Sequence, residues 1–123
     1  MKYIRIFADK DGETHMEDCT LAYRSDVIAK DVPSLHMSSL LKAEGVFFMH
    51  TVVDKTFRDL PFHNPPRRML VIQLRGSSEQ TTSDGTVRIV NPGDVLIAED
   101  VTGKGHKSRN IGSEVLYAMV PLT

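Results

Sequence analysis

The chain of 123 residues has a single cysteine, no tryptophan and no long apolar run. Cys19 cannot form a disulfide within the chain. Because Asp18 precedes it and no basic residue flanks it, we interpret it as a buried structural thiol rather than a nucleophile. No stretch reaches the roughly 18 apolar residues that a membrane span requires, and the first residues alternate instead of forming the apolar core of a signal peptide. These absences predict a cytoplasmic protein with no membrane partner.

The sequence also lacks an excess of charge of either sign. Fifteen basic residues and sixteen acidic residues give a formal net charge of −1. Such a chain has no strong field that would attract phosphates, so we do not expect nucleic acid as a partner. The contents of 41% hydrophobic and 25% charged residues are ordinary for a globular protein, and the length predicts one domain spanning residues 1–123.

A convincing amphipathic helix is missing as well. Instead, short apolar or alternating stretches recur at intervals of roughly 8 to 12 residues, and turn-forming Gly, Pro, Asn or Asp residues separate them. Strands are expected at residues 3–8, 13–23, 35–41, 46–53, 68–74, 77–82, 87–90, 95–97 and 115–120, with a further strand starting at His106. This spacing predicts an all-β fold, a closed antiparallel barrel of about eight or more strands whose interior fills with side chains or holds one small ligand.

Three local features refine this expectation. Residues 46–53 form the most apolar run and should be covered on both faces. Residues 54–66 should be irregular, because Pro61, Pro65 and Pro66 oppose helix and sheet alike. Residues 75–76 and residues 110–113 are expected to form turns that reverse the chain.

The stretch from residue 91 to residue 110, NPGDVLIAEDVTGKGHKSRN, contains the main functional signal. It predicts a turn, a short buried strand, and a polar loop that ends at His106. From there the residues alternate, so Lys107 and Arg109 should point away from the imidazole. A single histidine is therefore expected to begin a strand that has one solvent-exposed face.

This stretch resembles the second signature motif of the cupin superfamily, with Gly93, Gly103, His106 and Asn110 at four motif positions and Val101 where the motif has Pro. The run PGDVLIAEDVTGKGH is similar to a branch of small cupins with a single barrel. The resemblance implies a jelly-roll β-barrel, here a single cupin domain, and relatives that include isomerases, lyases, cyclases and dioxygenases.

The first cupin motif is degenerate in this chain. With Gly76 as its last glycine, His63 occupies the position of the first histidine, Pro65 that of the second, and Met69 that of the glutamate. The family's full set of three imidazoles and a carboxylate holds Fe, Mn or Ni. Here His63 and His106 are the metal candidates, and such an incomplete site implies a weakly held divalent metal or no cofactor at all.

Without a metal, the same two histidines suit acid-base catalysis. A neutral imidazole accepts a proton and an imidazolium donates one near neutral pH, so His63 and His106 are our candidate catalytic residues. The alternative is that each ring forms a hydrogen bond with a neighbour and fills space.

Strand parity and composition add candidates for ligand binding. Met69 and Gln73 share a face of their strand with Val71, whereas Leu70, Ile72 and Leu74 belong to the other face. Tyr117 offers a hydroxyl, His50 lies on a strand that lines the barrel, and Arg67 could bind a carboxylate at the barrel mouth. Five apolar side chains could form walls suited to an aromatic or hydrophobic ligand: Phe47, Phe48, Met49, Phe57 and Phe62.

Two classes of function follow. The first is an enzyme acting on a compact organic molecule, aromatic or bearing a carboxylate, by histidine chemistry or with an incompletely held metal. The second is a domain that binds or senses a small-molecule ligand without catalysis. The outward side chains of Leu70, Ile72 and Leu74 predict a homodimer.

Overall fold

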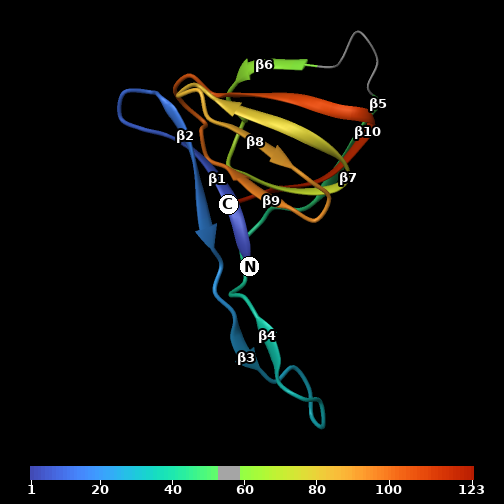
Figure 1. Cartoon of the computed structure of the whole chain (residues 1–123). Helices are drawn as coiled ribbons and strands as arrows, with labels where there is room; N and C mark the ends of the chain where they lie inside the picture. The colour runs from blue at the N-terminus through green and yellow to red at the C-terminus, as the bar shows by residue number, and fades with distance from the viewer. Residues whose placement is uncertain (53–58) are drawn as a thin grey trace.

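The computed structural model describes residues 1–52 and 59–123, which form strands and connecting loops with no helix (Figure 1). Among these residues there is accordingly no helix long and apolar enough to cross a bilayer. The strands are β1 (Lys2–Ala8), β2 (Thr14–Thr20), β3 (Arg24–Asp26), β4 (Leu35–Met37), β5 (Phe47–Val52), β6 (Asp59–His63), β7 (Met69–Thr82), β8 (Val87–Val90), β9 (Val95–Ala98) and β10 (His106–Pro121).

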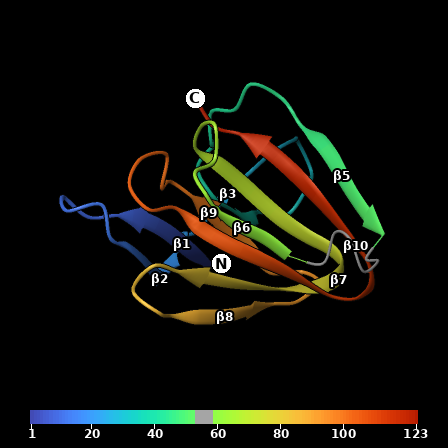
Figure 2. The same ribbon diagram turned by 90° about the horizontal axis from the view of Figure 1, so that it is seen from above.

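The two longest strands, β7 and β10, pair with each other along nearly their whole length and organise an eight-stranded sheet (Figure 2). The first part of β7 pairs with β9 and its second part with β8. In the same way, β10 pairs first with β6 and then with β5. The sheet therefore has a large half, in the order β2-β1-β9-β7-β10-β5, and a small half, β8-β7-β10-β6.

Gly76 forms the bend between the two halves. Its φ is +68°, and a Cβ atom there would lie 2.1 Å from the backbone oxygen of Glu114 and 2.8 Å from Val115 Cγ1 on the paired strand. Only glycine tolerates both the backbone angle and the close approach. On the partner strand, the register shifts between Ile111 and Leu116, so both long strands bend at the same place.

A small apolar cluster packs between the halves. Ile4 and Ile6 from β1 and Leu96 from β9 meet Val90 from β8, with Ile6 fully buried. Burying a side chain of this size contributes about 1.5–3 kcal/mol. The cluster fills one end of the space between the halves and leaves the other end open.

The fold confirms the all-β prediction, and its strand pairs are mostly antiparallel, with β1 and β9 as a parallel pair. A closed barrel is not found: among the described strands, β2 and β5 are the two ends of the large half and do not pair. The predicted turns at residues 75–76 and 110–113 are wrong. Glycine at these positions bends a continuous strand instead of reversing it.

Three further expectations fail, and each of them concerns a strand at an edge of the sheet. β5 was expected to be covered on both faces, yet it lies at the sheet edge, with Phe48 65% exposed. β6 contains Pro61 and still pairs with β10, because Pro61 lies where the register shifts and no ladder hydrogen bond from its nitrogen is needed. Cys19 on β2 is half-buried, not buried, with Sγ 3.6 Å from Glu17 Oε1.

Candidate functional site

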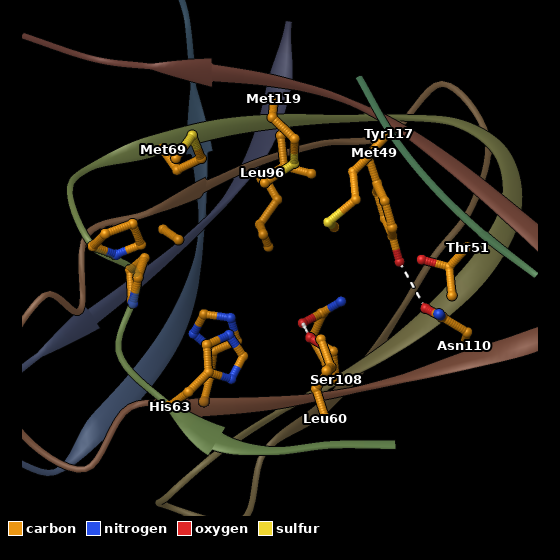
Figure 3. Close-up of a pocket in the computed structure, with 16 residues that line it drawn as sticks. Met49, Thr51, Leu60, His63, Met69, Leu96, Ser108, Asn110, Tyr117 and Met119 are labelled. Atoms are coloured by element: carbon orange, nitrogen blue, oxygen red, sulfur yellow. Dashed lines mark hydrogen bonds between the residues drawn. The ribbon is translucent and has the colours of Figure 1, made fainter. Parts of the chain in front are cut away.

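A cavity of about 320 Å³ lies between the two halves of the sheet (Figure 3). This volume is at the lower end of the range for small-molecule sites, which is about 300–1,000 Å³. The lining residues come from both halves: Met49, Thr51, Leu60, His63, Pro65, Pro66, Met69, Val71, Gln80, Leu96, Ala98, His106, Ser108, Asn110, Tyr117 and Met119. The cavity fits one compact organic molecule.

The chemistry of this lining is apolar with a few neutral polar groups. No Lys, Arg, Asp or Glu of the described residues lines the cavity. A charged ligand would lose its hydration without gaining an opposite charge, which is costly. The lining therefore favours an uncharged ligand that has hydrogen-bonding groups.

His106 is the most constrained polar residue of the cavity wall. Its ring is buried, and Nδ1 lies 2.7 Å from Oδ2 of Asp100, which is fully buried. Because a carboxylate can only accept, Nδ1 carries the proton and donates it to Asp100. Nε2 is then left with a lone pair that can accept a proton from a molecule in the cavity.

Asp100 depends on this contact. Its Oδ1 is buried and has no hydrogen-bond partner among the described residues. The carboxylate is thus directed at His106 alone, and it lies behind the imidazole rather than in the cavity wall. Asp100 acts as a positioning residue that fixes the orientation and tautomer of His106.

His63 lies beside His106, with ring centroids 4.8 Å apart. Its Nδ1 is 2.9 Å from the carbonyl oxygen of Pro61, and because a carbonyl can only accept, this nitrogen also carries its proton. His63 is exposed to solvent, whereas His106 is buried. The two rings form a path from the cavity wall to the surface.

The close approach of the two histidines depends on Gly105. Its φ is +73°, and a Cβ atom there would lie 2.2 Å from the carbonyl oxygen of His63. The carbonyl oxygen of Gly105 accepts a hydrogen bond of 2.6 Å from Thr14 Oγ1. Asn64 Nδ2 donates to the carbonyl oxygen of Asp100 at 2.8 Å. The loop before His106 is thereby fixed on both sides.

Polar groups at the other end of the cavity come from the same strand as His106. The hydroxyl of Tyr117 donates to Asn110 Oδ1 at 2.9 Å, and Thr51 lies next to this pair (Figure 3). Burial raises the pKa of Tyr117, so its hydroxyl keeps its proton at neutral pH. Ser108, between the two ends, donates to Gln80 Oε1.

The structure brings together four of the predicted site residues: His63, His106, Met69 and Tyr117 all line the cavity. Gln73 does not line it. Its amide is buried at the bend of β7, where Nε2 donates to the carbonyl oxygen of Gly76 at 2.9 Å and Oε1 accepts from Ser78 Oγ. Its polar groups are satisfied within the protein, so its role is to hold the bend.

His50 and Arg67 also lie outside the cavity. His50 pairs with Leu116 on the face of β5 opposite to Met49, and its Nε2 is 3.5 Å from Glu114 Oε2. Arg67 is exposed and forms an ion pair with Glu44, which leaves no carboxylate clamp in the cavity. Of the aromatic wall that we expected, Phe47, Phe48 and Phe62 do not line the cavity, and Phe57 lies outside the described residues.

The donor set does not fit a tightly held metal. Within residues 1–52 and 59–123, no group of three or more His, Cys, Asp or Glu side chains is placed to hold an ion. His63 and His106 offer two imidazoles, while Met69 and Pro65 occupy the remaining motif positions in the cavity wall. The side chains of His63 and His106 themselves are therefore the candidate acid and base groups of the cavity.

Sequence reasoning missed Ser108 and Asn110 as cavity residues. The signal was present, because His106, Ser108 and Asn110 are at alternate positions of a strand and must share a face. The predicted turn at 110–113 ended the strand too early. The pairing of Asp100 with His106 was also missed, since the loop of five residues between them gives no periodicity that would reveal it.

Comparisons with known proteins add little to this geometry. No protein-family model matches the chain, and no curated protein matches it. Among solved structures, the chain is similar to protein NMB1881 from Neisseria meningitidis, with a TM-score of 0.44 and 11% sequence identity over 85% of this chain and 89% of that one. The function is therefore inferred from the residues of the cavity.

Proposed function

We propose that the protein is a cupin-type enzyme that moves a proton on a compact, uncharged organic molecule held in the cavity, as isomerases and lyases do. The observation that carries this proposal is the buried Asp100–His106 pair, with Nδ1 bonded at 2.7 Å and Nε2 left for a ligand. A histidine that only filled space would not need a buried carboxylate behind it.

His106 acts as the general base. Nε2 takes a proton from the substrate, and the positive charge that develops on the imidazole is stabilised by the carboxylate of Asp100. Because the carboxylate is fully buried, its interaction with the imidazolium is stronger than it would be in water. Such general base catalysis contributes about 10²–10⁴-fold to a rate.

His63 completes the proton transfer. It lies next to His106 and is open to solvent, so it can return a proton to the product or exchange one with water. Its own Nδ1–H is held by the carbonyl oxygen of Pro61, which directs Nε2 as its exchanging nitrogen. The two rings therefore serve as base and acid on one substrate.

The other end of the cavity selects the substrate. Tyr117 and Asn110 offer a hydrogen-bonding pair opposite the histidines, and methionines and aliphatic side chains lie between the two ends. This arrangement suits a neutral molecule with an apolar middle and an oxygen at the far end. A carbonyl oxygen at that end can accept a hydrogen bond from the side-chain amide of Asn110, and conjugation along the molecule would acidify the C–H bonds at the histidine end.

Proton transfer can be tested without knowing the product. A panel of small neutral ketones, lactones and enols is incubated with the protein in D₂O, and loss of C–H signals is followed by ¹H NMR. We expect deuterium incorporation into at least one compound, and a decrease of about 100-fold or more in His106→Ala. His50→Ala is the matched control, because His50 lies outside the cavity and its variant should exchange at the wild-type rate.

The same experiment distinguishes a binding domain from an enzyme. If a compound binds in the cavity by NMR shift changes but no protein variant alters its exchange, the protein is a binding domain. Unchanged exchange in His106→Ala would remove the acid-base mechanism.

A further inference from the structure

A β-hairpin arm projects from the body of the protein. The arm comprises residues 22–41 and contains β3 and β4, which pair with each other and with no other described strand (Figure 1). Its base is fixed on both sides. Leu21 exchanges hydrogen bonds with Met1, and Lys42 and Glu44 bond to the backbone near the C-terminus. The arm itself extends into solvent.

The arm is rich in apolar side chains that the described part of the chain leaves exposed. Val27 is 61% exposed and Leu40 is 91% exposed. The other large apolar side chains that the arm leaves exposed are Tyr23, Ile28, Val32, Leu35 and Leu41. Single exposed apolar residues are normal, but so many on one projecting segment mark an interaction surface.

The same chain presents a sheet face that suits such a segment. On the outer face of the large half, opposite to the cavity, Phe48, Ala118, Ile72 and Val95 are paired in register across four strands. The far part of this row is covered by the chain itself, because Ala118 is buried and Ile72 and Val95 pack against the cluster of Leu70, Ile97 and Leu122. Phe48 is 65% exposed, and Leu74 next to the row is 45% exposed. We name this surface, around Phe48, Ile72 and Leu74, the outer row.

The topology links the arm to this face. The arm lies in the connection between β2 and β5, which are the two opposite edges of the large half. This connection projects from the molecule after Leu21 and rejoins the body at Lys42 and Glu44, where it bonds to the backbone near the C-terminus. The chain thus has an apolar segment that projects into solvent, while Phe48 and Leu74 at one end of its own outer row stay exposed.

We propose that the occupant of the outer row is the arm of a second copy of this chain, exchanged reciprocally about a two-fold axis. Each protomer supplies one arm and one outer row, which is the self-complementary arrangement that a closed dimer needs. Arm and outer row together match the 20–30 residues per partner of a standard interface, which buries about 800 Å² on each partner.

The charges of the arm agree with a second copy as partner. Its basic residues Arg24 and Lys30 are balanced by Asp26 and Asp31, and Arg24 Nη2 lies 3.5 Å from Asp26 Oδ2 within the arm. An arm without net charge does not repel an identical chain. It also lacks the basic stripe that would direct it to anionic lipid or nucleic acid.

The first test is the mass of the protein in solution. Sedimentation of the full chain should give a dimer, twice the chain mass of 13.8 kDa, at micromolar concentrations. Phe48→Asp on the outer row and Ile28→Asp on the arm should each weaken the dimer at least about 30-fold, as expected for an anchor of an interface. Val87→Asp is the matched control, since Val87 is equally apolar and exposed but lies on β8 in the small half.

Reciprocal exchange makes a sharper prediction for mixtures. When Phe48→Asp and Ile28→Asp proteins are mixed, the intact arm of one meets the intact outer row of the other, so one of the two interfaces is restored. The mixture should form heterodimers although each variant alone is a monomer. Leu74→Asp serves as a second outer-row variant, and circular dichroism with thermal unfolding shows that each variant is folded.

Several outcomes would overturn the proposal. A wild-type protein that stays monomeric at all concentrations rejects the dimer. A dimer that Ile28→Asp leaves intact rejects the arm as occupant, and one that Phe48→Asp and Leu74→Asp leave intact rejects the outer row. Failure of the two variants to associate when mixed rejects reciprocal exchange. None of these outcomes bears on the proton transfer proposed for the cavity.

Discussion

Asp100 Oδ2 lies 2.7 Å from Nδ1 of His106, and this contact determines which nitrogen of the imidazole faces the cavity. In Asp100→Asn, the amide can donate to Nδ1, which places the ring proton on Nε2 and removes the base. We expect the deuterium incorporation described above to fall by about 100-fold or more with the fold unchanged. The ¹⁵N shifts of His106 should report the change of tautomer. Wild-type exchange in this variant would show that Asp100 does not position the base.

Gly105 provides a second test of the site. Gly105→Ala should destabilise the protein by about 3 kcal/mol or more, because the added Cβ would meet the carbonyl oxygen of His63 at 2.2 Å in addition to the cost of a positive φ. Gly85→Ala is the matched control, with a φ of +90° and open space around its Cβ. It should cost about 1–2 kcal/mol. Urea denaturation measures the free energy of unfolding of both variants. Equal losses of stability in the two variants would contradict the close approach of Gly105 to the carbonyl oxygen of His63.

The contacts of His15 predict that the stability of the protein depends on pH. Its Nε2 lies 2.8 Å from Asp9 Oδ2 and its Nδ1 lies 3.0 Å from Asp84 Oδ2, so it joins the β1–β2 hairpin to the β7–β8 turn. The hydrogen bond to Asp9, supported by Asp84, raises the pKa of His15. Because the folded pKa is higher than the unfolded value, the stabilisation is complete below about pH 6.5 and is lost as the pH rises through the folded pKa.

Asp84, a carboxylate partner of His15, determines the pH below which this stabilisation is lost. Burial opposes the ionisation of Asp84, but hydrogen bonds from Thr82 and Thr86 outweigh it and lower its pKa to about 2. Its contribution is therefore present above about pH 4 and is lost on further acidification. The difference in unfolding free energy between wild type and His15→Gln should be largest near pH 5 and smallest near pH 9. A difference that is the same at both values would refute the ion pair.

The degenerate motif can be completed by mutation. Pro65 and Met69 line the same cavity as His63 and His106, so Pro65→His with Met69→Glu would supply three imidazoles and one carboxylate. We expect this double variant to bind Mn²⁺ or Ni²⁺ at least about 10-fold more tightly than the wild type, because each added ligand replaces a water molecule. Titration calorimetry measures the affinity, and adding His106→Ala should abolish the gain. No gain in the double variant would show that the four positions do not converge.

The strand pattern of the sequence predicted the all-β fold because residues that alternate on a strand must alternate between faces. Met69 was predicted for the cavity from its position in the cupin motif that the sequence resembles, and Tyr117 from its parity with Val115 and Met119. The long strands were predicted as separate hairpins, since Gly76 and Gly112 have the same local signal whether the chain reverses or bends. Which of the two occurs depends on the pairing of β7 with β10, a contact between distant parts of the sequence.

The candidate site was predicted only in part for a similar reason. His63 and His106 were predicted because they occupy histidine positions of the two cupin motifs that the sequence resembles. Gln73 looked like a ligand-binding group, but its partners are carbonyl oxygens at a bend that the sequence did not reveal. Arg67 looked like a carboxylate clamp, and only the fold shows that Glu44 reaches it first.

Strand β10 supplies polar and apolar groups to both ends of the cavity, since His106, Ser108, Asn110, Tyr117 and Met119 all belong to it. A large part of the cavity lining is therefore encoded in one short, contiguous piece of the gene. A library randomised at the positions of Ser108, Asn110 and Met119 would vary the shape of the chamber while leaving the bend glycines and the Asp100–His106 pair untouched. Changes within this single strand would therefore alter the chamber without a rearrangement of loops.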